Sequence, residues 1–171
     1  MLPRALASLA LFAVAPLFAA EPLDITDAAN NDAATAKVSG YFEGMGLVVD
    51  KKASYFLVKS GGYVIRISPL ATADLGSRLN AYITFGGGNP DNVKSDKLMS
   101  LLNTINAKYN YVTTYVDKDG SLSFRYVLVF DKKLDPKTIN LWLKHIELQT
   151  NAIRAEFGDQ LKAFLTKKSE K

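Results

Sequence analysis

The stretch between Leu98 and Phe130 restricts the possible folds of this chain more than any other part. Apolar residues at helical spacing open it and predict a helix, with Ser95 as the N-cap. They are Leu98, Leu101, Leu102, Ile105 and Tyr109. Next come β-branched and aromatic residues at 111–116, a polar turn at 117–120 and strict alternation at 122–130. Because alternating side chains point to opposite faces of a strand, the stretch predicts a helix followed by a β-hairpin.

The register of this hairpin depends on its turn. We expect Val116 to pair with Ser121. Tyr115 then lies opposite Leu122, which places an aromatic face of the hairpin against the helix. A β-bulge at Gly120 would shift this register.

The order of elements along the chain predicts an α+β fold over residues 32–166. A helix over 32–45 precedes three strands, and the helix and hairpin described above follow them. The three strands cover 55–59, 63–68 and 79–85. Asp135 and Pro136 begin a last helix that we expect to continue to about Leu165. The expected class is an antiparallel five-stranded sheet with helices packed mainly on one face, in the order α-β-β-β-α-β-β-α.

The N-terminus has the pattern of a secretory signal peptide. Arg4 is followed by an apolar run over 5–18, and the small residues Ala19 and Ala20 suit cleavage by signal peptidase. An uncleaved anchor is the alternative. We expect residues 1–20 to be removed and the mature protein to be periplasmic or secreted. No later segment approaches the roughly 20 apolar residues that a membrane-spanning helix needs, so no membrane span is expected.

The composition excludes several chemistries. The chain has no cysteine and a single histidine, His145, so thiol catalysis and cysteine-bound metals are excluded. Carboxylates do not cluster in a catalytic pattern, and we therefore expect no enzyme, no cofactor and no metal site. The formal net charge is +4. Residues 21–31 are acidic and polar, which predicts a flexible leader, and 167–171 form a basic tail.

The segment Leu101–Tyr111 resembles the central motif of the YbjN-type bacterial family. The shared pattern is an apolar pair, then Asn103, Asn106 and an aromatic-bearing run into a strand, followed by a turn and a second strand over 117–130. This resemblance implies the fold of class I type III secretion chaperones and carries no catalytic residues. Members of the family are described as sensory-transduction regulators, with a chaperone-like or protein-binding role.

Asn103 and Asn106 are the motif positions to which a binding role could be assigned. They lie three residues apart and therefore share a helix face, from which they could hold the backbone of a partner. The favoured interpretation is that they tie the helix to the next strand by side-chain-to-backbone hydrogen bonds. Five strand residues expected to point away from the core complete the candidate binding surface. They are Tyr82, Val112, Thr114, Arg125 and Val127.

Four further patterns have structural explanations that we favour over functional ones. Gly86–Gly88 could cradle a phosphate, but no helix follows directly, so a turn is expected. Asp117 and Asp119 resemble the start of a calcium loop without its closing ligands, and a hairpin turn explains them. His145 is expected at a surface or edge. The tyrosines of the hairpin region could stack on nucleic acid, but we expect them to form the core, and no nucleic-acid partner is expected.

These observations favour a non-enzymatic, exported protein that binds another protein. An open sheet face or an edge strand would accept an extended segment of that partner, and a homodimer through the same face is an alternative assembly. The competing hypothesis is a carrier of a small molecule or lipid, with a pocket between the sheet and the last helix. A large apolar cavity near Trp142 and Ile153 would support the carrier, and a tightly filled core there would reject it.

Overall fold

The computed structural model describes residues 21–71, 77–86, 88–131 and 133–165. The predicted signal peptide and the basic tail lie outside these residues. The described part contains α1 (Asn31–Gly44), α2 (Asp96–Lys108), α3 (Pro136–Leu165) and the short 3-10 helix η1 (Pro90–Lys94). Its strands are β1 (Leu23–Asp24), β2 (Val49–Lys51), β3 (Phe56–Ser60), β4 (Tyr63–Leu70), β5 (Ser77–Phe85), β6 (Thr113–Val116), β7 (Leu122–Phe130) and β8 (Lys133–Leu134).

The main sheet is antiparallel, with six strands in the order β2-β3-β4-β5-β7-β6, and β1 pairs with β8 in a separate small sheet. The α+β class is confirmed, but the expected number of five strands in the main sheet is wrong. The additional strand of the main sheet, β2, has three residues, two of them charged, so it lacks the apolar alternation that marks a strand in sequence. The small sheet was missed because its strands have two residues each.

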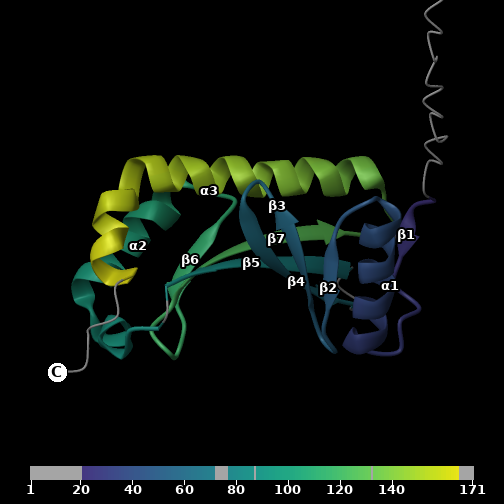
Figure 1. Ribbon diagram of the computed structural model, residues 1–171, viewed down its shortest axis with the longest axis horizontal. Helices are drawn as coiled ribbons and strands as arrows, with labels where there is room; N and C mark the ends of the chain where they lie inside the picture. The colour runs from purple at the N-terminus through teal and green to yellow at the C-terminus, as the bar shows by residue number, and fades with distance from the viewer. Residues whose placement is uncertain (1–20, 72–76, 87, 132, 166–171) are drawn as a thin grey trace, which may run out of the picture.

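The helices pack on one face of the main sheet. In Figure 1, α3 lies across the sheet, with α1 and α2 toward its two ends. The row Phe56, Ile67, Ala81 and Tyr126 crosses four paired strands, and all four side chains are buried. Phe42 of α1 packs edge-on against Phe56, with ring centroids 5.1 Å apart. The opposite face of the sheet carries the alternate residues and remains open.

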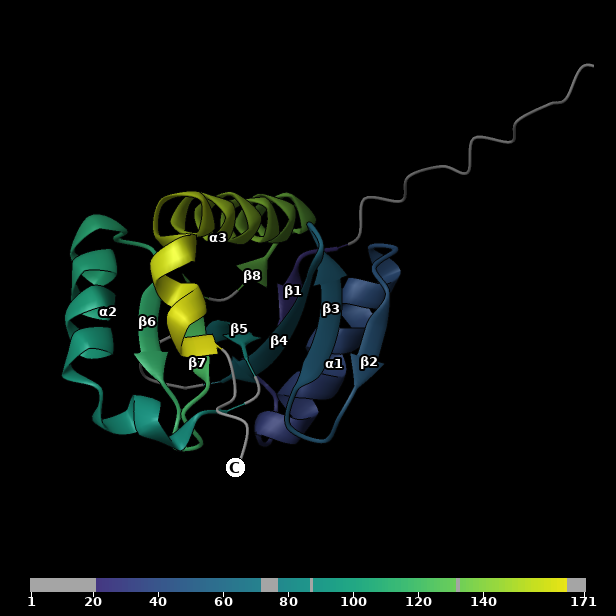
Figure 2. The ribbon, with the colours of Figure 1, turned by 60° about the vertical axis from the view of Figure 1, so that its left-hand side comes forward.

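The helix ends follow the predicted capping chemistry. The Ser95 side chain accepts a hydrogen bond from the Leu98 amide, and the Asp135 carboxylate accepts one from the Thr138 amide. As predicted, α3 continues to Leu165 as one helix. Figures 1 and 2 show that its C-terminal end, drawn in yellow, turns down past the end of the sheet.

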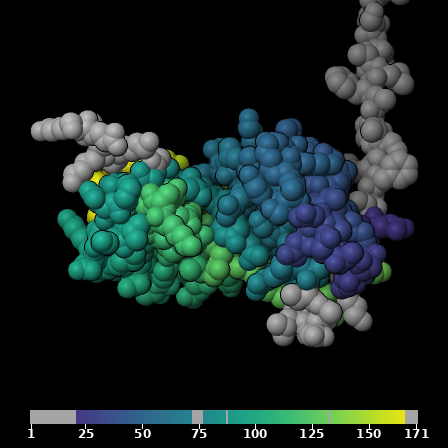
Figure 3. All heavy atoms as spheres, turned by 90° about the horizontal axis from the view of Figure 1, so that it is seen from below, coloured from purple at the N-terminus to yellow at the C-terminus, as the bar shows by residue number. Residues whose placement is uncertain are grey.

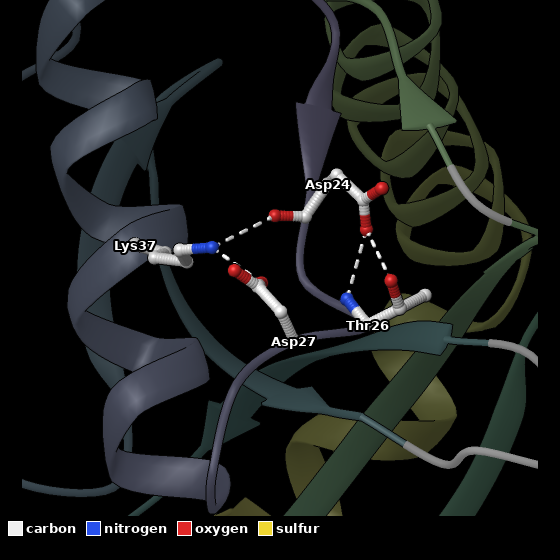
Figure 4. A network of polar contacts seen from close by, with 4 residues as sticks. All are labelled: Asp24, Thr26, Asp27 and Lys37. Carbon is white, nitrogen blue, oxygen red and sulfur yellow. Dashed lines mark hydrogen bonds and ion pairs between the residues drawn. The ribbon is translucent and has the colours of Figure 1, made fainter.

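The residues expected to be a flexible leader are partly built into the fold. Leu23 pairs with Leu134 in the small sheet, and Ile25 is fully buried. Lys37 of α1 reaches back to the Asp24 carbonyl at 3.4 Å and to the Asp27 carboxylate at 2.5 Å, as Figure 4 shows. The expectation of a flexible leader over 21–31 is therefore wrong, because two apolar side chains and one lysine attach it to the domain.

The hairpin between β6 and β7 has a register shifted by one residue from the expected one. Val116 pairs with Leu122, and Tyr115 pairs with Ser123. The Asp117 amide donates to the Ser121 carbonyl, and Gly120 has a φ of 80°, so a bulged turn inserts one residue. Tyr115 consequently lies on the open face, away from the helices.

Tyr126 is the largest fully buried side chain of the core. Its hydroxyl lies 2.7 Å from the Thr150 hydroxyl, which itself donates to the Ile146 carbonyl. Because the single Thr150 hydroxyl hydrogen is used in that bond, Tyr126 must donate to Thr150. Burial raises the pKa of Tyr126 to about 12, above the ordinary value of 10.0.

Replacing Tyr126 by phenylalanine is expected to reduce the loss of stability at high pH. Between about pH 10 and 12 the unfolded chain releases a proton that folded Tyr126 retains, so stability falls as pH rises, by up to about 2–3 kcal/mol. Urea denaturation at pH 8 and at several values above pH 10 measures this. Tyr126→Phe should lose about 1 kcal/mol at pH 8 with its hydrogen bond, and then decline less steeply than wild type. If the stability of both proteins fell equally with rising pH, the raised pKa of Tyr126 would not be the cause.

Candidate functional site

The open sheet face is formed by the side chains of β3, β4, β5, β6 and β7 that point away from the helices. Figure 3 views the molecule from this side, with the yellow end of α3 largely hidden. One row of register partners crosses the face. It consists of Leu57, Arg66, Tyr82, Arg125 and Thr113. Val64, Val127 and Val129 flank this row and expose 53%, 43% and 65% of their surface. The face therefore combines charge, an aromatic ring and exposed valines.

Arginine and tyrosine form the centre of the open sheet face. The Arg66 guanidinium lies 4.4 Å from the ring centroid of Tyr82 and 5.8 Å from that of Tyr55. This cation–π geometry orders the arginine and leaves hydrogen-bond donors in its plane for a partner. Arg125 is the register partner of Tyr82 on the other side. Arg78, four residues before Tyr82 on β5, is also exposed on this face.

Of the candidate surface residues, three lie where the sequence predicted and two do not. Arg125 and Val127 are exposed and Tyr82 is half-buried, all on the open sheet face. Thr114 is 3% exposed and pairs with Phe124 on the core side, and Val112 is 6% exposed and precedes β6. The prediction that these two side chains point away from the core is wrong, because the bulged turn shifts the register of β6.

Asn106 closes the outer edge of β6 instead of facing a partner. Its Oδ1 accepts from the Thr114 amide at 2.7 Å and from the Thr114 hydroxyl at 2.9 Å, and its Nδ2 donates to the Thr114 carbonyl at 3.0 Å. The side-chain amide thus occupies the place of a neighbouring strand. The interpretation that Asn106 ties the helix to the next strand is correct, and its amide is not available to a partner. Asn103 is exposed on the same helix.

A second candidate site is a pocket of about 740 Å³ between the C-terminal half of α3 and one end of the sheet, here called the α3 pocket. Its apolar lining residues come from β5, β7 and α3, and they include Phe85, Leu122, Phe124, Leu161 and Leu165. The rings of Phe85 and Phe124 meet edge-on with centroids 5.0 Å apart. Trp142 and Ile153, near which a cavity would have supported the carrier hypothesis, belong to the packed core and do not line this pocket.

The polar rim of the α3 pocket is organised around Tyr63. The Tyr63 hydroxyl donates to Asn151 Oδ1 at 2.6 Å and accepts from Arg154 Nη1 at 3.2 Å. The acidic rim residues each have a lysine partner. Lys108 Nζ lies 2.5 Å from Glu156, and Lys162 Nζ lies 2.8 Å from Asp159. The hydrogen bond from Lys108 holds the pKa of Glu156 below its ordinary value.

This pocket was missed in the sequence because its residues come from segments far apart in the chain. Tyr63, Leu122 and Arg154 carry no common motif, and each fits the local pattern of its own strand or helix. The pairing of β4, β5 and β7 and the turn of α3 toward the end of the sheet bring them together. The only hint in the sequence lies in the last helix beyond Ile153. There, apolar residues recur at helical spacing, and polar residues lie beside them on the helix.

The remaining sequence patterns have structural roles. Gly86 and Gly88 have positive φ, whereas Gly87 lies outside the described residues. The helix α2 begins only after η1, so the glycines do not open onto a helix. The Asp119 carboxylate accepts from the amide and hydroxyl of Ser121 within the turn. Over the described ranges, no group of three or more His, Cys, Asp or Glu side chains could hold a metal ion.

The aromatic residues of the hairpin region divide between core and surface. Phe124 and Tyr126 are buried, as expected. Tyr111 is 69% exposed and its ring stands edge-on to His145, with centroids 4.9 Å apart. The expectation that Tyr111 belongs to the core is therefore wrong, because it precedes β6 instead of lying within the strand. His145 is half-buried at the surface of α3.

The fold and these sites define a class of protein: a small α+β domain with one open face on an antiparallel sheet and a pocket under its last helix. In the part of the chain that the structure describes, no helix is sufficiently long and apolar to cross a membrane. Residues 82–159 match the family model YbjN, described as "Putative bacterial sensory transduction regulator". This match contains Leu101–Tyr111, and the resemblance of that segment to the YbjN-type family is confirmed.

A similar solved structure bears the description "Crystal structure of YbjN, a putative transcription regulator from E. coli". It superposes with a TM-score of 0.52 at 14% sequence identity, and the match covers 73% of this chain and 91% of that chain. At this identity the likeness concerns the fold alone. No curated protein matches the chain.

Proposed function

We propose that this protein is a non-enzymatic, chaperone-like regulator that acts after export and binds an extended, acidic segment of a partner protein on its open sheet face. The observation that carries the proposal is the row Arg66, Tyr82 and Arg125, which crosses three neighbouring strands without a helix over it. The description of the YbjN family as a sensory transduction regulator supports a role in protein interaction. A sheet face of this kind can hold an extended chain by side-chain contacts at regular spacing.

Charge complementarity favours an acidic partner. Arg66, Arg78 and Arg125 lie on adjacent strands of the open sheet face, and all three are exposed. Asp50, which pairs with Leu57 at the edge of this face, already has Lys52 as an ion-pair partner at 3.0 Å. The face therefore presents a positive surface, which accelerates encounter with acidic chains and disfavours basic ones. The exposed valines supply apolar contact beside these charges.

Arg125→Glu is expected to weaken partner capture by about tenfold or more, because it reverses the charge at the centre of the open sheet face. The test is a pull-down with residues 21–171 from an extract of exported proteins, with captured proteins identified by mass spectrometry. Light scattering of the same preparation reports whether the chain forms a homodimer. The fold should be unaffected, since the Arg125 side chain is exposed.

Lys137→Glu is the matched control. It makes the same change in net charge at an exposed position on α3, away from the open sheet face. A protein captured by wild type and by Lys137→Glu, but lost with Arg125→Glu, would support the proposal. Equal capture by all three proteins would show that the partner does not bind the open sheet face at Arg125. If both variants lost capture equally, net charge and not the face would govern binding.

Carriage of a small molecule or lipid is the second candidate function. The α3 pocket favours it, because its volume of about 740 Å³ lies within the range of about 300–1,000 Å³ that is usual for pockets that bind small molecules. The pocket lies between the sheet and the last helix, as the carrier hypothesis requires, although Trp142 and Ile153 do not line it.

A further inference from the structure

The polar rim of the α3 pocket contains as many carboxylates as cations, but neither carboxylate pairs with its arginine. Its two carboxylates, Glu156 and Asp159, are each paired with a lysine. Arg154 has no ion-pair partner among the described residues, and only one of its contacts with them is a hydrogen bond, to the Tyr63 hydroxyl. An arginine carries five N–H donors. Arg154 can therefore offer a charge and several donors to a group that enters the pocket.

The position of Arg154 is held by its surroundings. The guanidinium carbon lies 5.8 Å from the ring centroid of Tyr63, and the Tyr63 hydroxyl is in turn fixed by its bond to Asn151. An arginine ordered in this way loses less conformational entropy on binding an anion than a free one does. The floor beside it is apolar, with the half-buried side chains of Phe85 and Leu165. A ligand that contacts both the Arg154 guanidinium and the apolar floor must have an anionic head and an apolar chain.

We propose that the α3 pocket binds an aliphatic carboxylate, a medium-chain fatty acid, with its carboxylate on Arg154 and its chain over Phe85 and Leu165. This inference rests on the second candidate function and names its ligand class. Arginine and carboxylate form a bidentate, charge-assisted pair, which is the strongest head-group contact the rim can make. The chain would displace water from the apolar floor.

The first test uses four probes with residues 21–171 and isothermal titration calorimetry. Decanoate, below the concentration at which it forms micelles, should bind with one site per chain. Decanol and decyltrimethylammonium should bind at least about tenfold more weakly, because neither can pair with an arginine. Equal affinities for decanoate and decanol would show that the carboxylate does not contact Arg154. Binding to phosphatidylglycerol vesicles without binding to decanoate would assign the site to a membrane surface and overturn the proposal.

Arg154→Gln should reduce the affinity for decanoate by about tenfold or more and leave the weak affinity for decanol unchanged. Arg125→Gln removes the same charge from the open sheet face and should leave decanoate binding unchanged. A general electrostatic effect would weaken both variants equally, which would contradict a specific role of Arg154.

A pocket-filling variant tests the apolar part independently. Gly158 lines the pocket, and a Cβ added there has no atom within 4 Å. Gly158→Leu should abolish decanoate binding and preserve the fold, since leucine favours a helix more than glycine does. Gly40→Leu is the matched control, because Gly40 lies in α1 with open space around it and outside the pocket. Decanoate binding that survives Gly158→Leu would show that the ligand lies elsewhere.

The two proposals can fail separately. Arg154→Gln and Gly158→Leu should not alter partner capture by the open sheet face, and Arg125→Glu should not alter decanoate binding. If the wild-type protein captured its partner but did not bind decanoate, only the proposal for the α3 pocket would fail.

Discussion

Gly120→Ala is expected to destabilise the protein by about 2–5 kcal/mol, the sum of a left-handed backbone and a steric clash. Gly120 has a φ of 80°, and a Cβ there would lie 1.8 Å from the carbonyl oxygen of Asn89. This neighbour is backbone and cannot move as a flexible side chain would. The Gly120 carbonyl also accepts from Asn92 Nδ2, which donates to the Phe164 carbonyl as well. A shifted turn would therefore disturb the end of α3.

Gly46→Ala separates the two contributions. Gly46 has a φ of 82°, nearly the same as that of Gly120, but a Cβ there has no atom within 4 Å. It should cost only about 1–2 kcal/mol, from backbone strain alone. Urea denaturation followed by circular dichroism measures both variants. Equal losses of stability would show that the close approach of Asn89 to the turn does not contribute.

Asn106→Ala is expected to cost about 2–3 kcal/mol, because three hydrogen bonds to Thr114 are lost and its backbone amide and carbonyl remain at a partly buried edge. The edge of β6 would also become available to another chain, and we expect increased self-association. Thermal denaturation and light scattering over a range of concentrations measure these two effects.

Asn103→Ala is the control for this variant. It makes the same substitution on the same helix at an exposed residue, so it changes helix propensity equally without opening the strand edge. Its stability should be unchanged or slightly raised. A comparable loss in both variants would mean that the bonds to Thr114 contribute little.

The local elements could be predicted because their signals lie within short segments. Ser95 and Asp135 are side chains that cap a helix wherever one begins, and the structure shows both in that role. Alternation over 122–130 marks a strand whatever its neighbours are. The α+β class and the resemblance to the YbjN-type family followed from the order of such elements and from the motif in α2.

The elements that were missed are those with short or polar sequences. Three residues of β2 and two each of β1 and β8 carry no periodic pattern, and pairing with a neighbour alone makes them strands. Leu23 and Ile25 look like isolated apolar residues in an acidic segment. They are buried because the domain offers them a place beside α1 and β8.

The candidate site shows the same division. Arg125 and Val127 were correctly placed because they alternate with buried residues of their own strand. Thr114 was misplaced because one extra residue in the turn at Gly120 reverses every side chain of β6, and sequence alternation is weak in a strand of four residues. The use of Asn106 as a substitute strand depends on how α2 lies beside β6.

The sequence by itself determined the helices, the longer strands, the capping residues, the family resemblance and the absence of cysteine, since each depends on residues close together in the chain or on composition. Tertiary structure alone decided the open sheet face and the α3 pocket. Strand pairing placed Arg66, Tyr82 and Arg125 in one row, and the path of α3 brought Arg154 to Tyr63 across 91 residues of sequence. Such sites arise from packing between distant segments, for which local periodicity carries no information.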